Sequence, residues 1–263
     1  MSLFSSFKIS VILLMSIGLT CCSSSNAPKP ETSKELLIYC GITMIKPMAE
    51  IAEHIESQEK CKVIITKGGS GNLLKSIHIN QVGDLYLPGS DTYINTCLKD
   101  GLVTETAHVG FNKAAMMVPK GNPKSITSDL ANLMRKDLYI VIGDANSGSI
   151  GKETKKILEK KGIFEQVQAN ARRLTTDSKD LINVLKNKEA DLVINWYATA
   201  TWPENKDYVD VLPIDEKYAE SKKLVLGLLK TSHQPDIARK FIEYAASEKG
   251  RAIFVKYGLY DVL

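Results

Sequence analysis

The chain has 263 residues, of which 44% are hydrophobic, 24% charged and 7% aromatic. This is the composition of a globular protein, and it excludes a disordered, collagen-like or coiled-coil chain. The 34 lysines and arginines exceed the 30 acidic residues by four, and only five of the 34 are arginines. Because nucleic-acid-binding domains concentrate arginine in basic clusters, this balance argues against nucleic acid as a partner.

Residues 1–21 have the pattern of an export signal peptide. Lys8 supplies a positive charge, and the apolar run after it is too short to span a membrane. Small residues then precede Cys21 and Cys22, which resembles the signal of bacterial lipoproteins, where an acylated cysteine becomes the new N-terminus. The position of Leu19 favours Cys22 as the lipidation site, with Cys21 as the alternative. An ordinary cleaved secretory signal is the other interpretation.

Residues 22–34 are polar and contain two prolines. Their composition predicts a tether between the lipid anchor and a folded body outside the cytoplasm. The protein is then lipid-anchored in the cell envelope, in the periplasm or on the outer face of the cytoplasmic membrane. Cys40, Cys61 and Cys97 match no metal-binding or redox spacing, so we expect no metal site, and either one disulfide or three thiols.

Short apolar runs alternate with amphipathic segments along the rest of the chain. The expected strands, in chain order, are 36–39, 63–66, 84–87, 114–118, 138–142 and 192–196. The expected helices have apolar faces within 48–55, 73–77, 181–185 and 237–245; a short helix capped by Ser128 ends at residue 133, and a basic helix ends near residue 161. This alternation is typical of an α/β fold with largely parallel sheets.

Three of the expected loops combine glycine with neutral hydroxyl or amide side chains. They are Gly41–Thr43, Gly69–Asn72 and Asn146–Ile150, and each precedes an expected helix. Ligands of α/β folds bind where strand C-termini meet helix N-termini. Glycine lets the backbone approach a ligand closely, and the free N–H groups at a helix start favour an anion. The loops therefore predict an anion-binding site.

Enzymatic motifs are incomplete in the same loops. Gly143 and Gly148 have the spacing of a P-loop, but Ser149 follows where a P-loop requires lysine. The loop 69–72 lacks the last glycine of a nucleophile elbow, and no dinucleotide-binding glycine pattern is present. We therefore expect no enzymatic activity and no cofactor. A secreted serine hydrolase with Ser70 as its nucleophile is the alternative from another class.

A resemblance to a known family rests on the order and spacing of several segments: 39–43, 67–77, 83–87, 142–144, 189–192 and 252–258. On these segments the chain resembles the substrate-binding lipoproteins of ABC importers, most of all the periplasmic molybdate- and tungstate-binding proteins. The resemblance covers nearly the whole mature chain. It implies a two-lobed periplasmic-binding-protein fold of type II, a monomer, an ABC permease as the membrane partner, and an anion enclosed between the lobes.

The resemblance also implies a division of the folded body. Lobe I comprises residues 35–113 and a return segment, residues 205–263, while lobe II comprises residues 114–204. Each lobe is expected to be a mostly parallel sheet flanked by helices, and two crossing strands join the lobes.

Residue roles follow from the resemblance position by position. Thr43 and Ser70 fall where the family has hydroxyl donors, and Ile150 and Ser178 fall where it has backbone N–H donors. Trp196 falls where the molybdate-binding proteins usually have a tyrosine. The secondary candidates beside these positions are Gly69, Gly71, Ser147, Ser149 and Asn195.

The chemistry of these five positions bears on the ligand. They supply hydrogen-bond donors and no carboxylate; Asp144 and Asp177 lie nearby in loop or cap positions. A fully deprotonated tetrahedral anion needs only donors, whereas a protonated phosphate also needs an acceptor. This favours molybdate or tungstate, followed by sulfate, and then by phosphate or a small organic anion.

Overall fold

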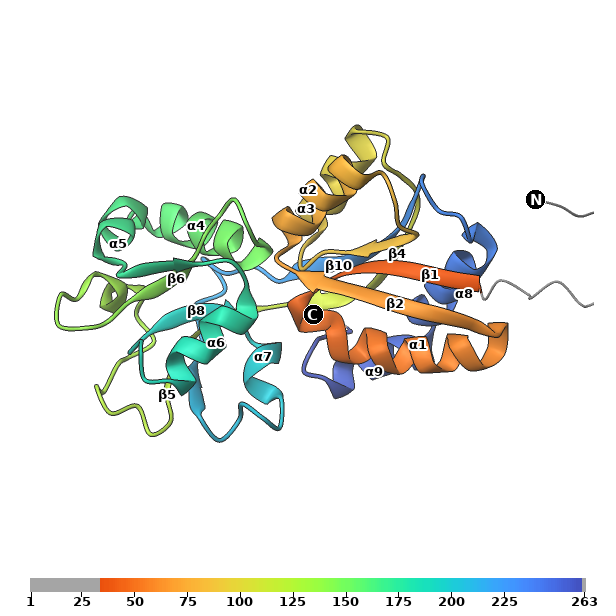
Figure 1. Cartoon of the computed structure of the whole chain (residues 1–263). Helices are drawn as coiled ribbons and strands as arrows, with labels where there is room; N and C mark the ends of the chain where they lie inside the picture. The colour runs from red at the N-terminus through yellow and green to blue at the C-terminus, as the bar shows by residue number, and fades with distance from the viewer. Residues whose placement is uncertain (1–33, 262–263) are drawn as a thin grey trace, which may run out of the picture. The chain divides into compact units, whose positions relative to one another are not determined.

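The computed structural model describes residues 34–261 (Figure 1). The expected signal peptide, most of the tether and both candidate lipidation cysteines, Cys21 and Cys22, lie outside these residues. Within the described part, no helix is long and apolar enough to cross a membrane.

The first sheet has five strands in the order β2-β1-β3-β10-β4. Their bounds are β1 (Lys34–Gly41), β2 (Cys61–Gly68), β3 (Leu85–Leu87), β4 (Val103–Asn112) and β10 (Lys222–Leu229). Strands β2 and β3 pair with β1 in parallel, whereas β10 is antiparallel to both β3 and β4. We call the part of the molecule built on this sheet lobe I.

Helices cover both faces of the lobe I sheet. They are α1 (Ile45–Glu59), which follows the 3-10 turn η1 (Ile42–Met44), and α2 (Ser70–Asn80), α3 (Asp91–Lys99), α8 (Pro235–Ala246) and α9 (Glu248–Lys256). Figure 1 shows α2 and α3 on one face and α1 and α9 on the other. The apolar positions Met48, Ile51 and Ile55 recur at helical spacing and are all buried in α1, so the expected amphipathic helix is confirmed.

Lobe II contains a three-stranded antiparallel sheet and a parallel strand pair. The sheet has the order β8-β5-β9, and the pair consists of β6 and β7. The strand bounds are β5 (Ala114–Pro119), β6 (Val141–Gly143), β7 (Arg173–Thr175), β8 (Val193–Trp196) and β9 (Val209–Leu212). The helices are η2 (Leu130–Met134), α4 (Ser149–Lys161), α5 (Phe164–Asn170), α6 (Ser178–Lys186) and α7 (Ala198–Thr201).

Separate hydrophobic cores support the two lobes. Lobe II has one cluster that includes Met117, Leu181 and Ile194, and lobe I has clusters on the two faces of its sheet. The two-lobed α/β fold is confirmed. The lobe I sheet combines parallel and antiparallel pairs, and the three-stranded sheet of lobe II is antiparallel, so the expectation of a mostly parallel sheet in each lobe is wrong. The antiparallel strands β4, β5, β9 and β10 are the ones that lead into and out of the two crossings.

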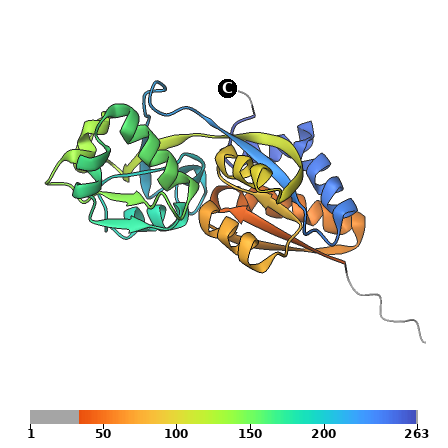
Figure 2. The same cartoon turned by 90° about the horizontal axis from the view of Figure 1, so that it is seen from above.

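The chain crosses between the lobes twice. The first crossing is Lys113, between β4 and β5, and the second is the segment between β9 and β10. Figure 2 shows both crossings, the first in yellow-green and the second in blue. The expected return to lobe I at residue 205 is wrong, because β9 pairs with β5 and Ile214 and Ala219 are buried in the lobe II core. Strand β9 has only four residues, and their sequence shows no pattern that distinguishes a strand from a loop.

The expected cap at Ser128 is also wrong. The N-cap of η2 is Asp129, whose side chain accepts a hydrogen bond from the N–H of Ala131, and the element is a 3-10 turn. Aspartate and serine are equally good caps, so the sequence does not choose between adjacent candidates. The three described cysteines beyond the tether, Cys40, Cys61 and Cys97, are free thiols.

Candidate functional site

A small cavity lies between the lobes, at the ends of the strands where the glycine-rich loops were expected to meet. The cavity has a volume of about 10 Å³. Its lining residues are, from lobe I, Gly41, Ile42, Thr43, Gly68, Gly69, Ser70 and Gly89, and, from lobe II, Gly148, Ser149, Ile150, Asp177, Ser178 and Trp196. All five primary candidates from the sequence are therefore brought together.

Three helices begin at this cavity. Ser70, Ser149 and Ser178 are the first residues of α2, α4 and α6, which have nine or more residues each. The first N–H groups of a helix have no partner inside the helix, and the helix dipole places a partial positive charge at the same end. Three such ends from two lobes make the cavity favourable for an anion without any basic side chain in its lining.

The hydroxyl groups in the lining are oriented by neighbours that donate to them. The N–H of Gly89 donates to Ser70 Oγ at 3.0 Å, and the indole N–H of Trp196 donates to Ser149 Oγ at 3.2 Å. A hydroxyl that accepts a hydrogen bond keeps its own hydrogen for another acceptor. Both serine hydroxyls can therefore donate to a bound anion.

Asn112 donates a hydrogen bond to the Thr43 hydroxyl, lies outside the cavity lining, and was not among the expected site residues. Its Nδ2 donates to Thr43 Oγ1 at 3.2 Å, and Thr43 Oγ1 lies 2.7 Å from Met44 Sδ. Because a thioether is a weak acceptor, an anion competes with it for the threonine hydrogen. Asn112 ends β4 directly before the first crossing, and no motif in the sequence indicates this contact.

Trp196 and Asn195 have different positions although they are neighbours in β8. The Trp196 ring is 1% exposed and lines the cavity. Asn195 Nδ2 donates to the carbonyl of Ser178 at 3.0 Å, and its Oδ1 accepts from the N–H of Trp196. Asn195 thus fixes the start of α6 against β8 and stays outside the lining.

Of the other four secondary candidates, two line the cavity and two lie outside the lining. Gly69 and Ser149 line the cavity, whereas Gly71 and Ser147 do not. The carbonyl of Ser147 accepts from the N–H of Asn72 at 3.1 Å, which joins the two lobes beside the cavity. The Ser147 hydroxyl donates within lobe II, to the carbonyls of Asp144 and Thr176.

Glycine is required where the lobes approach each other most closely. A Cβ atom on Gly69 would lie 2.5 Å from the carbonyl oxygen of Ser147 and 2.6 Å from that of Thr176. Both oxygens belong to the backbone of the other lobe, so neither can move aside as a side chain can. A glycine at position 69 therefore permits the lobes to close over the cavity.

Asp177 is the ionisable side chain in the lining. Its Oδ1 accepts from the backbone N–H groups of Lys179 and Asp180, at 2.8 Å and 3.2 Å, and so caps α6 as expected. Burial raises the pKa of the Asp177 carboxyl above its usual value, and those two N–H groups partly oppose this rise. The sequence indicated the cap, but it did not indicate that the same residue lines the anion cavity.

A groove with four lysines adjoins the cavity and shares Ile42 with it. The groove has a volume of about 280 Å³ and contains Lys46, Lys67, Lys179, Lys186 and a single carboxylate, Glu204. Lys46 of lobe I pairs with Glu204 at 2.7 Å. This ion pair joins α1 of lobe I to the segment between α7 and β9 of lobe II. Because the groove contains four lysines and one carboxylate, it is positively charged.

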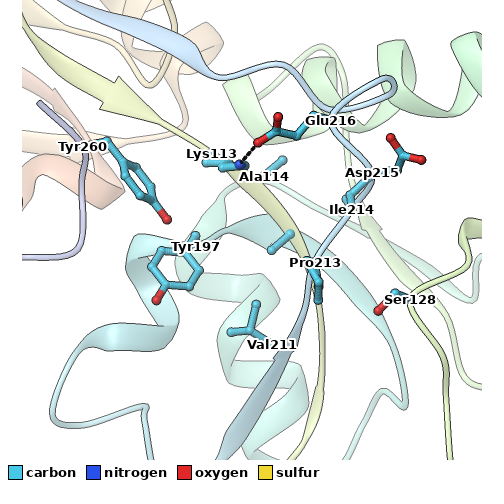
Figure 3. A pocket seen from close by; sticks show the side chains of 11 residues that line it. Lys113, Ala114, Ser128, Tyr197, Val211, Pro213, Ile214, Asp215, Glu216 and Tyr260 are labelled. Atoms are coloured by element: carbon cyan, nitrogen blue, oxygen red, sulfur yellow. Dashed lines mark hydrogen bonds and ion pairs between the residues drawn. The ribbon is translucent and has the colours of Figure 1, made fainter. Parts of the chain in front are cut away.

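A larger cavity of about 600 Å³ lies beside the two crossings (Figure 3). One pair of neighbouring residues is divided between the two cavities, because Trp196 lines the anion cavity and Tyr197 lines the larger one. Figure 3 shows Tyr197 beside Tyr260 and the ion pair of Lys113 with Glu216, whose nitrogen and oxygen are 2.7 Å apart.

Several curated proteins resemble the chain over most of their length. A protein of Haemophilus influenzae named as a binding protein is 27% identical over 85% of this chain and 90% of its own. A protein of Bacillus subtilis named as an ABC transporter substrate-binding lipoprotein is 25% identical over 97% and 98%. The molybdate-binding protein ModA of Mycobacterium tuberculosis is 22% identical over 94% and 95%.

Solved structures share the fold. The periplasmic molybdate-binding protein of Azotobacter vinelandii superimposes with a TM-score of 0.75 at 15% identity, covering 87% of this chain and 99% of its own. The sulfate-binding protein SubI of Mycobacterium tuberculosis gives a TM-score of 0.74 at 14% identity and covers 87% of each chain. At these identities the comparison establishes the two-lobed fold.

A family model described as the bacterial extracellular solute-binding protein matches residues 36–260. The match spans both lobes and every segment that lines the anion cavity. The family is one of binding proteins, which agrees with the expectation that the chain is not an enzyme, and the expected resemblance to molybdate-binding proteins is confirmed by the relatives above. The chain belongs to the bacterial extracellular solute-binding protein family.

Proposed function

We propose that the protein is the substrate-binding lipoprotein of an ABC importer and that it binds a tetrahedral oxyanion, molybdate or tungstate, in the cavity between the lobes. The ligand is enclosed as the lobes close and is then delivered to a membrane permease. Binding and lobe closure constitute the mechanism, and no bond is broken.

The convergence of three helix N-termini on one small cavity carries this proposal. Thr43, Ser70 and Ser149 add hydroxyl groups, and the first turns of α4 and α6 add backbone N–H groups near Ile150 and Ser178. Donors of this kind stabilise an anion by distributing its charge, without a counter-ion. The small volume favours a compact four-oxygen anion over a sugar or an amino acid.

The relatives support the same ligand class. One curated relative is named for molybdate, and the two solved structures described above are named for molybdate and sulfate. Both of these ligands, molybdate and sulfate, are tetrahedral anions. The choice among them depends on the lining, where Trp196 replaces the tyrosine that we expect in molybdate-binding proteins, so its indole N–H can donate but not accept.

Isothermal titration calorimetry with molybdate, tungstate, sulfate and phosphate tests the proposal. We expect molybdate and tungstate to bind most tightly, followed by sulfate and then phosphate. If none of the four binds more tightly than about 10 μM, the oxyanion proposal is wrong. Phosphate or a small organic anion as the tightest ligand would retain the transport function and change the substrate.

The cellular context is a separate part of the proposal. We propose that residues 1–21 are removed, that Cys22 (or Cys21) is lipidated, and that the monomer is held at the membrane by this anchor. Mass spectrometry of the mature N-terminus tests this directly. A diacylglyceryl mass on the first peptide that is lost in Cys22→Ser supports Cys22, its loss in Cys21→Ser alone supports Cys21, and an unmodified N-terminus contradicts the anchor.

A further inference from the structure

Asp177 occupies an unusual place in a cavity that is otherwise built from neutral donors. Among the described residues that line the cavity, it is the one with an ionisable side chain. Its Oδ1 is used for the cap of α6, and Oδ2 accepts no hydrogen bond from any described residue. The second carboxylate oxygen therefore has no hydrogen-bond partner among the described residues. A ligand held beside Asp177 could hydrogen-bond to it only with a proton between the two.

The charge balance requires that proton when a dianion binds. An ionised carboxylate beside a doubly charged anion in this partly buried cavity is unfavourable, because the protein screens the repulsion less than bulk water does. A protonated carboxyl group removes one of the charges and adds a donor. The repulsion thereby becomes a hydrogen bond to the anion.

The charged groups around Asp177 do not cancel the repulsion between its carboxylate and a bound dianion. On α6 itself, Asp180 raises the pKa of Asp177 and Lys179 lowers it, so the two act in opposite directions. On neighbouring elements, Lys67 lies one residue before the end of β2, Lys46 is the second residue of α1, and Asp144 lies in the loop before α4. Both lysines belong to the adjoining groove rather than to the cavity lining, and η1 and β8 contribute no charged group to the lining.

We propose that Asp177 couples oxyanion binding to a proton. When a fully deprotonated dianion such as molybdate binds, the Asp177 carboxylate takes up one proton from solvent and donates it to an anion oxygen. When the anion brings its own proton, as hydrogen phosphate does, Asp177 stays ionised and accepts that hydrogen bond. The inference rests on the proposed function, and it makes Asp177 the residue that sets selectivity by anion protonation state.

The pH dependence has a definite sign. Burial already raises the pKa of the Asp177 carboxyl in the free protein, and a bound dianion raises it further. Affinity for molybdate therefore rises as the pH falls through the pKa of the complex, by up to about tenfold per pH unit, and levels off below the pKa of the free protein. Phosphate affinity does not follow this curve, because its proton comes with the ligand.

Calorimetry with molybdate between about pH 6 and 8.5, in two buffers with different ionisation enthalpies, measures the affinity and the proton uptake together. For the wild-type protein we expect up to one proton taken up per anion bound. In Asp177→Asn, which keeps an N-cap side chain, we expect no uptake, a flat pH profile, and tighter molybdate binding than the wild type at the highest pH. Phosphate binding should be weakened in the same variant.

Asp180→Asn is the matched control, since it removes a carboxylate three residues away that is outside the cavity lining. It should retain the proton uptake of the wild type. Molybdate binding with no proton uptake at any pH, or with the same uptake in Asp177→Asn, would overturn the inference and leave the proposed function intact. Failure of every anion to bind would contradict the proposed function instead. Asp177→Ser, also a capping residue, provides a second neutral variant if Asp177→Asn folds poorly.

Discussion

Of the two cavities beside the crossings, the smaller one is the candidate binding site. The hinge-side cavity of Figure 3 has about 600 Å³, and the anion cavity has about 10 Å³ on the same measure. The larger one is lined by Val211, Pro213, Ile214 and two tyrosines, and its charged groups are paired or exposed at the rim. The smaller one is where three helices begin.

This difference shows that the direction of polar groups, rather than volume, identifies the binding site. A pocket with apolar walls offers contact area, whereas convergent N–H and hydroxyl groups offer recognition of a particular charge and shape. Two neighbouring residues at the end of β8 are divided between the cavities, because Trp196 lines the smaller one and Tyr197, which follows it, lines the larger one. Substitutions in the smaller cavity should therefore affect anion binding, and those in the larger one should not.

The largest effect is expected from Thr43→Ala combined with Ser70→Ala. Each hydroxyl donates to a charged ligand, and a hydrogen bond of that kind contributes about 1.5–3 kcal/mol. The double variant should therefore bind molybdate about 10²- to 10⁴-fold more weakly by calorimetry. Ser128→Ala, a hydroxyl removed from the hinge-side cavity, is the control and should bind normally. Normal binding by the double variant would show that these hydroxyls are not ligands.

The second effect concerns closure of the lobes. Gly69→Ala places a methyl group against two backbone carbonyls of lobe II, so the lobes cannot approach fully. Overpacking of this kind costs about 1–3 kcal/mol, which predicts roughly 5- to 150-fold weaker binding. Ser76→Ala is the control, because Ser76 lies in the same helix α2 that Gly69 precedes but outside the cavity lining, and its hydroxyl donates only to the carbonyl of Asn72. Equal affinities for the two variants would contradict the close-approach role of Gly69.

A smaller effect is expected from the lysine groove, and it should appear in the association rate. Lys67→Gln with Lys179→Gln removes two positive charges from the groove beside the cavity. We expect an association rate constant about 2- to 10-fold lower at low ionic strength, with an unchanged dissociation rate and a difference that disappears in high salt. Stopped-flow fluorescence of Trp196 and Trp202 measures both rates. Lys249→Gln on α9 is the control, and an effect of the same size there would indicate only overall charge.

The smallest effect is expected on the hinge side. Glu216→Gln breaks the ion pair with Lys113, whose partner carboxylate is 82% exposed. Exposed pairs contribute little, so molybdate affinity should stay within about twofold of the wild type. A larger change would mean that the hinge-side cavity influences lobe closure, and the separation of the two cavities would then have to be revised.

Local patterns were enough to identify many of the elements and the composition of the site. The recurrence of Met48, Ile51 and Ile55 predicts α1, because one helix face must be apolar to be buried. Gly69-Ser70-Gly71 predicts a helix start that favours an anion, and α2 begins there. These features depend on neighbouring residues alone, so no knowledge of the rest of the fold is needed.

Other features depend on distant pairings that leave no local pattern. β10 lies between β3 and β4 in the lobe I sheet, and β9 pairs with β5 in lobe II, although each is far in sequence from its partner. The boundary of lobe II was misplaced for this reason. A short strand is stabilised by the sheet that it joins rather than by its own residues.

The sequence by itself determined that this chain is an α/β protein with neutral, glycine-rich loops at helix starts, because backbone propensity, capping and amphipathic spacing are local properties. Only the tertiary structure decided which side chains share one cavity. It placed Asp177 among the donors and Asn112 beside Thr43, and it directed Ser147 and Asn195 away from the lining to hold the backbone. Those assignments follow from how two lobes close on each other, which no single segment specifies.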